Sequence, residues 1–436
     1  MAPSTTIARR QSQHGRRSIN RWLVWSVYAM TLIAAPLLFK SSLALTLLSQ
    51  AGYLIIICLS YNILLGQGGM LSFGHAVYSG LGTYLAIHAM NLAGSEKFVI
   101  PLSLVPLVGG ISGLFFSALL GYLTTRKAGT TFAMISLGIG EMVFAVAVMF
   151  PGFFGGEGGI TTNRVYGEPV LGITFGPQIE VYYLIAAYCF CCTAAIFALT
   201  RTPLGRMLNA VRDNPERAEF IGYNSQQVRY YSFMIAGFFA GIGGGLAAIN
   251  LEIVTAEAVG SVRSGNLLLF TFLGGTSYFF GPIIGACLMV LALGLLSELS
   301  LAWLLYLGLG FVVMVMYAPG GLASLLMVNL RLALFGKLHR LWTAYLAVFV
   351  SALVSLLSAI ALTEMVYHQQ LKAAIGPELH LFGLALDTAR PATWLFAVFI
   401  LLIGLGLLEF ARRRFALRWN AIKEEIVAEN SQGKVP

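Results

Sequence analysis

The segment Thr202–Ala248 reads TPLGRMLNAVRDNPERAEFIGYNSQQVRYYSFMIAGFFAGIGGGLAA. Its first part is polar and carries Arg206, Arg212, Arg217 and Arg229, and its second part is a glycine-rich apolar stretch. Stretches apolar enough to cross a bilayer lie on both sides of the polar part, which we call the island (residues 200–232). This asymmetry predicts a chain of lipid-soluble helices with one sizeable internal loop that a soluble partner can reach.

The overall composition is that of a membrane protein. Charged residues make up 10% of the 436 positions and hydrophobic residues 58%, whereas a soluble domain has about 25% charged residues. Apolar runs of about 18 residues or more recur along the chain, which predicts an all-α, polytopic membrane protein. An outer-membrane barrel is excluded, because its strands alternate in polarity over about ten residues.

Hydropathy predicts about twelve transmembrane helices, about ten in a core that ends near residue 330 and two in a C-terminal hairpin. The expected spans are Trp22–Phe39, Leu43–Leu65, Met70–Met90, Val99–Leu123, Thr130–Phe150, Val181–Leu199, Phe233–Ile249, Asn266–Phe280, Pro282–Leu299, Leu301–Tyr317, Trp342–Thr363 and Trp394–Phe410.

The distribution of Lys and Arg predicts the orientation. With the amino terminus inside, the inside segments carry 21 of the 27 basic residues and the outside segments carry 6. Both termini and the island are therefore expected on the cytoplasmic side of the membrane. The net charge of +9 then reflects topology and gives no reason to expect nucleic-acid binding.

Three regions are expected along the chain. Residues 1–21 form a basic cytoplasmic segment, followed by a first helix that we expect to be retained and not cleaved as a signal peptide. Residues 22–330 form the core that contains the island. Residues 331–436 form an extension with two transmembrane helices and a cytoplasmic tail.

Glycine interrupts the apolar pattern at two places, Leu65–His75 (LGQGGMLSFGH) and Leu273–Pro282 (LGGTSYFFGP). Both place a Gly-Gly pair a few residues before Phe-Gly, one in each half of the core. Paired broken helices in corresponding halves mark the substrate path in transporters built from repeats. Two ordinary tight turns are the alternative interpretation.

The glycines at 237, 241 and 243–245 separately predict a smooth helix face for close packing.

Polar residues inside spans are costly and are therefore candidates for function. Glu141 lies near the middle of a span, and it could line a substrate path, carry a proton or bond a neighbouring hydroxyl. His75 follows the first glycine break, where a helix-break hydrogen bond is favoured over a proton relay. The candidate pathway residues are Asn62, Gln67, Ser72, His75, Glu141, Gly274 and Gly275.

Signatures of catalysis and metal binding are missing from the sequence. It has no G-x-x-x-x-G-K-[ST], H-E-x-x-H or G-x-S-x-G element. Cys189, Cys191 and Cys192 cluster within one span without histidine or carboxylate partners nearby, so helix packing is the favoured reading. We expect no enzyme activity, no cofactor and no metal.

The island itself has the signals of a short helix-turn-helix. Asp213-Asn214 offers an N-cap, Pro215 suits the first turn, and Gly222 suits the end of the second helix. A capped helix continuous with a transmembrane helix could transmit motion from outside the bilayer. A solvated loop is the alternative.

Three blocks together resemble the LivM-type branched-chain amino acid permeases of ABC importers. They are Leu64-Leu65-Gly66 through Leu71-Ser72-Phe73-Gly74-His75-Ala76, then Pro203-Leu204-Gly205-Arg206 with the rest of the island, then Leu273-Gly274-Gly275 through Gly281-Pro282-Ile283-Ile284-Gly285-Ala286. They occur in family order, Pro319–Leu322 fits the closing segment of the family, and the resemblance covers about residues 43–330.

The resemblance implies a multi-pass protein of the bacterial cytoplasmic membrane that works with four partners. These are a homologous second permease, two cytoplasmic ABC ATPases that hydrolyse the ATP, and an extracytoplasmic substrate-binding protein. The implied ATPase-coupling residues are Arg206, Asn214, Glu216, Arg217, Ala218, Glu219 and Gly222. Asn266 departs from the family, which often has an acidic residue there, and the extension after residue 330 lies outside the usual core.

The implied cargo is a branched-chain amino acid, and relatives for urea, amides or other small organic solutes keep the choice open. Two interpretations from other classes also remain. One is a self-contained secondary transporter with a proton path through Glu141 and His75, and the other is an intramembrane enzyme built on the same residues.

Overall fold

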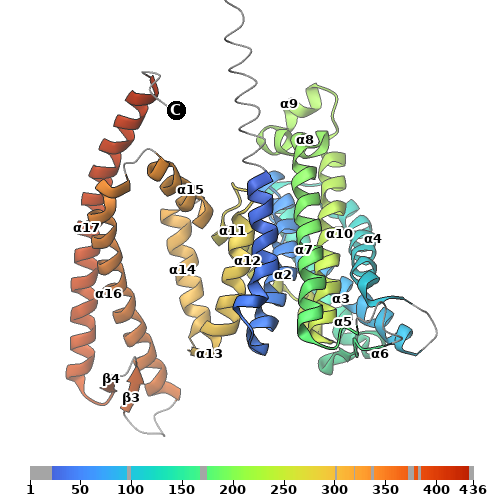
Figure 1. The fold of residues 1–436 in the computed structure, drawn as a ribbon, viewed down its shortest axis with the longest axis horizontal. Helices are drawn as coiled ribbons and strands as arrows, with labels where there is room; N and C mark the ends of the chain where they lie inside the picture. The colour runs from blue at the N-terminus through green and yellow to red at the C-terminus, as the bar shows by residue number, and fades with distance from the viewer. Residues whose placement is uncertain are drawn as a thin grey trace, which may run out of the picture. The chain divides into compact units, whose positions relative to one another are not determined.

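The computed structural model describes residues 22–95, 100–166, 174–299, 302–318, 320–334, 338–371, 378–381 and 384–431. The predicted basic segment 1–21 and Pro319 lie outside these residues. The described part is predominantly helical (Figure 1) and divides into two compact units. The first comprises Met1–Gly294 and Met314–Ala323, and the second comprises Leu295–Val313 and Ser324–Pro436. The second unit therefore begins before the predicted seam near residue 330.

The first unit is a bundle of long helices with short elements between them. Its helices are Trp22–Leu38, α2 (Ser42–Asn62), α3 (His75–Gly94), α4 (Val105–Thr124), α5 (Gly129–Met149), α6 (Pro151–Phe154), α7 (Gln178–Arg201), α8 (Pro203–Asp213), α9 (Pro215–Phe220), α10 (Ser225–Leu251), α11 (Ser261–Gly274) and α12 (Gly281–Leu291). A π-helical turn, η1 (Ile63–Gln67), extends α2, and another, η5 (Ala292–Leu296), extends α12. Short 3-10 turns are η2 (Leu102–Leu104), η3 (Gly156–Gly158) and η4 (Ala256–Val259), and strands β1 (Ile160–Thr161) and β2 (Ile253–Val254) pair antiparallel.

Helix α10 is the centre of this unit. In its apolar window 83% of the residues are buried, against 50% or less in the other long apolar helices. Its glycines allow neighbouring backbones to touch it: a Cβ at Gly245 would lie 2.8 Å from the Pro106 Cα of α4, and one at Gly82 of α3 would lie 2.8 Å from the Gly241 Cα. Real Cβ atoms essentially never approach so closely. The predicted close-packing face of this helix is confirmed.

The same helix begins directly at the end of the island. The Asn224 side chain accepts hydrogen bonds from the backbone N–H groups of Gln226 and Gln227, at 3.0 and 3.1 Å, and caps α10 at its first residue, Ser225. From there α10 continues for 27 residues without interruption. The predicted continuity between the island and the apolar glycine-rich helix is therefore confirmed.

Each of the twelve predicted spans overlaps a helix in the described part of the chain, but Met70–Met90 begins before α3 and Asn266–Phe280 runs past the end of α11 at Gly274. Seven helices of the described part are long and apolar enough to cross a membrane, or up to eight if the bent pair Trp303–Tyr317 and Gly321–Leu330 forms one span. Helices Trp22–Leu38 and Gly281–Leu296 are apolar but shorter. An all-α polytopic membrane protein is confirmed, and the count of twelve stays a prediction. The sequence analysis missed α15 (Gly321–Leu334), because Asn329 and Arg331 interrupt its apolar pattern.

The second unit is dominated by a long helical hairpin. Helices α16 (Leu338–Leu371) and α17 (Pro391–Ser431) pack along each other, and the antiparallel strands β3 (Glu378–Leu381) and β4 (Leu384–Asp387) lie between them in sequence. The Arg418 guanidinium donates to the Thr343 hydroxyl at 2.8 Å across the pair. Helices α13 (Ser297–Leu299), α14 (Trp303–Tyr317) and α15 precede the hairpin, and α14 continues into the first unit.

The close contact of α10 with α4 predicts that Gly245→Val destabilises the protein. The added side chain meets backbone atoms of Pro106, which cannot move aside, and overpacking of this kind costs about 1–3 kcal/mol or more. We expect a lower melting temperature of the purified protein in detergent. Gly138→Val on α5 is the matched control, because nothing lies within 4 Å of a Cβ there. Equal melting temperatures in the two variants would contradict the packing role of α10.

Candidate functional site

The island folds into two short helices, α8 and α9, at one end of α7 and α10 (Figure 1). The Asn214 side chain accepts a hydrogen bond from the Arg217 backbone N–H at 2.9 Å and caps α9. Gly222 has a φ of +90°, and the Tyr223 N–H bonds to the Ala218 carbonyl at 3.1 Å, which closes the helix in the way that favours glycine. The predicted N-cap and helix end are both confirmed.

Helix α9 has one buried side chain and an exposed apolar tip. Ala218 is 2% exposed, whereas Phe220 and Ile221 are 90% and 65% exposed, and Tyr223 beside them is also exposed. We call Phe220, Ile221 and Tyr223 the Phe220 patch. Of the other candidate coupling residues, Arg206 is exposed on α8, and Asn214, Glu216, Arg217, Glu219 and Gly222 are exposed on or beside α9. Six of the seven therefore lie on the surface.

Helix α8 contacts the first glycine break directly. The Arg212 guanidinium donates to the Gly66 carbonyl in η1, and Asp213 accepts from the same guanidinium at 2.9 and 3.0 Å. Gly69, with a φ of +63°, lies so close that a Cβ there would be 2.8 Å from the Arg212 Cγ. Sequence reasoning noted Arg212 only as one charge of the island, because its contact is with residues far away in the chain.

The two glycine breaks lie against each other. A Cβ at Gly66 would be 2.6 Å from the carbonyl oxygen of Thr276 in the second break. Gly275, with a φ of +111°, packs in turn against the Gly320 carbonyl, and a Cβ at Gly274 would be 2.6 Å from the Gly285 nitrogen. The breaks that sequence analysis paired by composition are therefore neighbours in space, next to the island.

The polar pathway candidates near the first break are mostly buried in helix packing. Asn62, Ser72 and His75 are at most 4% exposed, and Gln67 is partly buried. The His75 Nε2 and the Ser60 hydroxyl are 2.9 Å apart, and the Tyr61 hydroxyl donates to the Ser72 carbonyl at 2.8 Å. His75, the first residue of α3, is therefore within hydrogen-bond distance of α2, and its role stays a prediction.

A cavity of about 610 Å³ lies at the other end of α10, between α5, η4, α11 and α12. Glu141 is the one pathway candidate that lines it; the other six do not. The charged and polar residues of its wall are Thr83, Glu141, Thr255, Glu257, Ser261, Arg263 and Asn266. Much of the remaining wall is apolar and includes Phe144, Leu251, Val262 and Met289.

Sequence analysis missed Glu257 and Arg263 as site residues. Both lie in the connection between two spans, where charge is ordinary, and only the packing of η4 and α11 beside α5 brings them to Glu141. A Cβ at Gly260 would lie 3.6 Å from the Phe144 ring of α5, which shows how closely the connection approaches that helix. Among the described residues, no cluster of three or more His, Cys, Asp or Glu side chains has the arrangement of a metal site.

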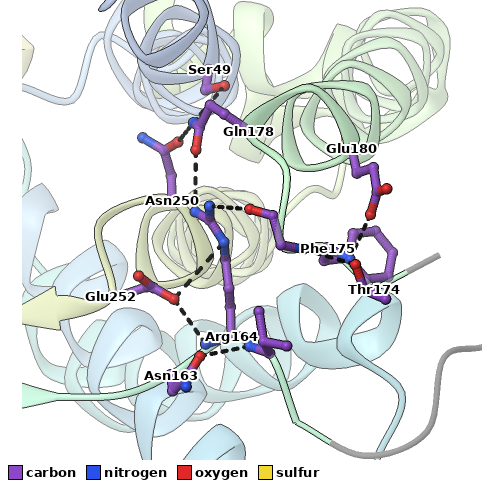
Figure 2. A network of polar contacts seen from close by, with 11 residues as sticks. Ser49, Asn163, Arg164, Thr174, Phe175, Gln178, Glu180, Asn250 and Glu252 are labelled. Carbon is purple, nitrogen blue, oxygen red and sulfur yellow. Dashed lines mark hydrogen bonds and ion pairs between the residues drawn. The ribbon is translucent and has the colours of Figure 1, made fainter. Parts of the chain in front are cut away.

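A polar network fixes the loop beside this end of α10 (Figure 2). The Arg164 guanidinium donates to the Gly176 carbonyl at 2.9 Å and to the Gln178 side chain at 3.2 Å, and it lies 3.8 Å from the Glu252 carboxylate. Gln178 donates to the Asn250 side chain at 2.7 Å. The loop before α7 is therefore tied to the last turn of α10, next to the cavity residue Leu251.

Comparison with known families matches residues 43–318 to the family described as branched-chain amino acid transport system / permease component. The chain belongs to this family. The matched segment contains the island, both glycine breaks and the whole cavity wall. The protein is therefore a permease component of this transport family, which is not a family of enzymes.

Individual relatives have the same general function. The high-affinity branched-chain amino acid permease LivM of Salmonella typhimurium is 27% identical over 299 residues, which cover 64% of this chain and 69% of the relative. LivM of Escherichia coli is 26% identical over the same shares. The nucleoside ABC transporter permease NupC of Lactococcus lactis is 25% identical over 255 residues, 54% of this chain and 74% of the relative. No solved structure matches the chain.

The capping geometry predicts that Asn214→Ala loosens α9. The Arg217 N–H loses its acceptor, and such a cap contributes about 1 kcal/mol. We expect faster hydrogen exchange of the amides of α9 in the otherwise folded protein. Asn209→Ala within α8 is the control, since it leaves the cap of α9 intact. Unchanged exchange in α9 of the Asn214 variant would show that the cap is not what orders this helix.

Proposed function

We propose that this chain is the transmembrane permease subunit of an ATP-driven ABC importer in the bacterial cytoplasmic membrane. Its partners would be a homologous second permease, two cytoplasmic ATPases of which one binds at the island, and an extracytoplasmic binding protein at the opposite end. The cargo would be branched-chain amino acids, as the names of the LivM relatives suggest.

The observation that carries this proposal is the build of α9. It is a capped helix with an exposed apolar tip, the Phe220 patch, and only residues 221–224 separate it from α10, the most deeply buried helix of the unit. Exposed apolar clusters of this kind mark protein interaction sites. A partner that moved α9 would act on the centre of the bundle.

The contact of Arg212 with the first glycine break offers a second route for motion. The guanidinium connects α8 to the Gly66 carbonyl, and Gly66 lies against Thr276 of the second break. A displacement of the island therefore reaches both places where the helices leave regular geometry. Irregular backbone at membrane depth is where repeat-built transporters move and bind their substrates.

Glu141 supports a path along the face of α5 that holds the cavity. It lies near the middle of that helix, and its side chain is exposed in the single chain. A charged side chain facing lipid at this depth costs about 2.5–3.5 kcal/mol. A water-filled path between this chain and the second permease would remove that cost.

The other candidate functions have less support. A proton path from Glu141 to His75 would need a connection between them, but His75, at the start of α3, is buried and does not line the cavity that contains Glu141.

A nucleoside cargo is favoured by one observation, the similarity to NupC and to the guanosine permease NupQ of Bacillus subtilis. A nucleoside importer would have the same architecture as the proposed amino acid importer and would differ only in the solute.

Copurification in mild detergent tests the importer proposal. We expect a tagged copy of the chain, expressed in its native cells, to retain the second permease and a stoichiometric pair of ATPases. Uptake of solute by the chain alone in proteoliposomes, driven by a proton gradient and without ATPases, would instead establish a secondary transporter.

Removing the charges of α9 should uncouple transport. The double substitution Glu216→Ala and Arg217→Ala changes two exposed residues of the coupling helix, so we expect uptake to fall severalfold while ATP hydrolysis continues and the protein stays inserted. Lys127→Ala, an exposed charge on the neighbouring loop between α4 and α5, is the control. Normal ATP-driven uptake by the double variant would refute the assignment of α9.

The Arg212 contact makes a separate prediction. Arg212→Gln replaces the charged donor to the Gly66 carbonyl with a shorter, uncharged one, and a hydrogen bond from a charged donor contributes about 1.5–3 kcal/mol. We expect uptake per ATP hydrolysed to fall about tenfold, with partial recovery in Arg212→Lys. Assays in proteoliposomes that measure solute uptake and ATP hydrolysis together would show this. An unchanged ratio of solute taken up to ATP hydrolysed in Arg212→Gln would mean that motion does not pass through this contact.

A further inference from the structure

The cavity wall carries charged groups that form no ion pair with the described residues of the chain. Glu141 of α5, Glu257 of η4 and Arg263 of α11 line the same space, and none of the three belongs to an ion pair within the described part of the chain. The Arg263 Nε is buried without a hydrogen-bond partner. Glu141 and Glu257 are exposed and Arg263 is partly buried, so all three charged groups are open to pair with a solute that enters this space.

Arg263 is the cationic group of this wall. Its guanidinium interacts electrostatically with the buried Tyr53 of α2, and its Nε is buried without a hydrogen-bond partner. Asn266, one turn further along α11, adds an uncharged amide to the wall. A guanidinium fork matches the two oxygens of a carboxylate better than any other side chain does.

The rest of the wall suits an aliphatic body. Phe144, Leu251, Val262, Met289 and Leu293 surround the charged groups. The volume of about 610 Å³ falls in the range of about 300–1,000 Å³ that is typical of small-molecule sites. The cavity thus combines one cationic group, two carboxylates and an apolar lining.

We propose that this cavity binds a zwitterionic, aliphatic α-amino acid, with Arg263 paired to its carboxylate and Glu141 to its ammonium group. Glu257, which is exposed, adds a second carboxylate for the ammonium group. The proposal rests on the proposed function, since it takes the cavity as part of the transport path. An uncharged nucleoside would leave Arg263 and Glu141 unpaired, so the wall favours the amino acid over the nucleoside.

Uptake by the complete transporter tests the two pairs. The chain is reconstituted in liposomes with its second permease, ATPases and binding protein, and leucine uptake is compared in Arg263→Gln and Glu141→Gln. We expect a loss of at least about tenfold in each, because each removes a charge-assisted hydrogen bond to the solute. Glu157→Gln is the matched control, since Glu157 is an exposed carboxylate of η3 that does not line the cavity, and it should transport normally.

A binding measurement on the wild-type complex, without the binding protein, separates recognition from folding. A ligand that binds only the native state stabilises it by an amount that grows with the logarithm of one plus the ratio of ligand concentration to Kd, and so raises the melting temperature. Leucine at about 50 mM should raise the melting temperature. Leucinamide, which lacks the carboxylate, and 4-methylpentanoate, which lacks the ammonium group, should have little effect. Arg263→Lys and Glu141→Asp should retain part of the leucine effect.

The outcomes distinguish this inference from the proposed function. Leucine uptake at the wild-type rate in both glutamine variants, or equal stabilisation by leucine and both analogues, would overturn the zwitterion site and leave the importer assignment standing. ATP-driven uptake of a nucleoside and of no amino acid would overturn both the site and the proposed cargo. If a glutamine variant does not assemble, the comparison of the three ligands on the wild-type complex still decides.

Discussion

The close backbone contact between α10 and its neighbours is the constraint on which the rest of the first unit depends. Lipid tails are as apolar as leucine, so helices in a membrane gain little from burying apolar surface and must gain from atomic contact instead. The glycines of α10 let α3 and α4 approach to distances that no Cβ would permit. Because α10 is packed so closely against α3 and α4, we expect the three helices to move together.

This packing relates the two ends of the unit to each other. The island lies at one end of α10 and the cavity at the other, about 40 Å apart for a helix of this length. Between them lie two glycine breaks that touch each other and, through Arg212, the island. In the proposed importer, α10 and the breaks would connect an ATPase to the solute. Coupling of this kind requires an element with two discrete arrangements, and the breaks are the natural candidates for it.

Much of this arrangement could be predicted from local sequence, and the remainder depends on tertiary contacts. Asn214, Pro215 and Gly222 specify α9 by themselves, because capping involves only neighbours in the chain, and composition predicts the helical membrane fold. Polar residues within predicted spans made both Glu141 and His75 pathway candidates. Glu141 lines a cavity, whereas His75 is buried in helix packing, and the periodicity of the sequence does not reveal this difference. Arg263 and Arg212 were not predicted as site residues, since Glu141, which lines the cavity with Arg263, and Gly66, which Arg212 contacts, both lie more than a hundred residues away in the chain.

The central claim is that the Phe220 patch docks a cytoplasmic ATPase. Photo-crosslinking from this position in native membranes tests it most directly, with p-benzoylphenylalanine in place of Phe220 and, as a control, in place of Phe115, which is exposed on α4. The claim predicts an adduct between this chain and an ATPase subunit from position 220 and none from position 115. An assembled, active transporter that gives no ATPase adduct from position 220 would contradict it.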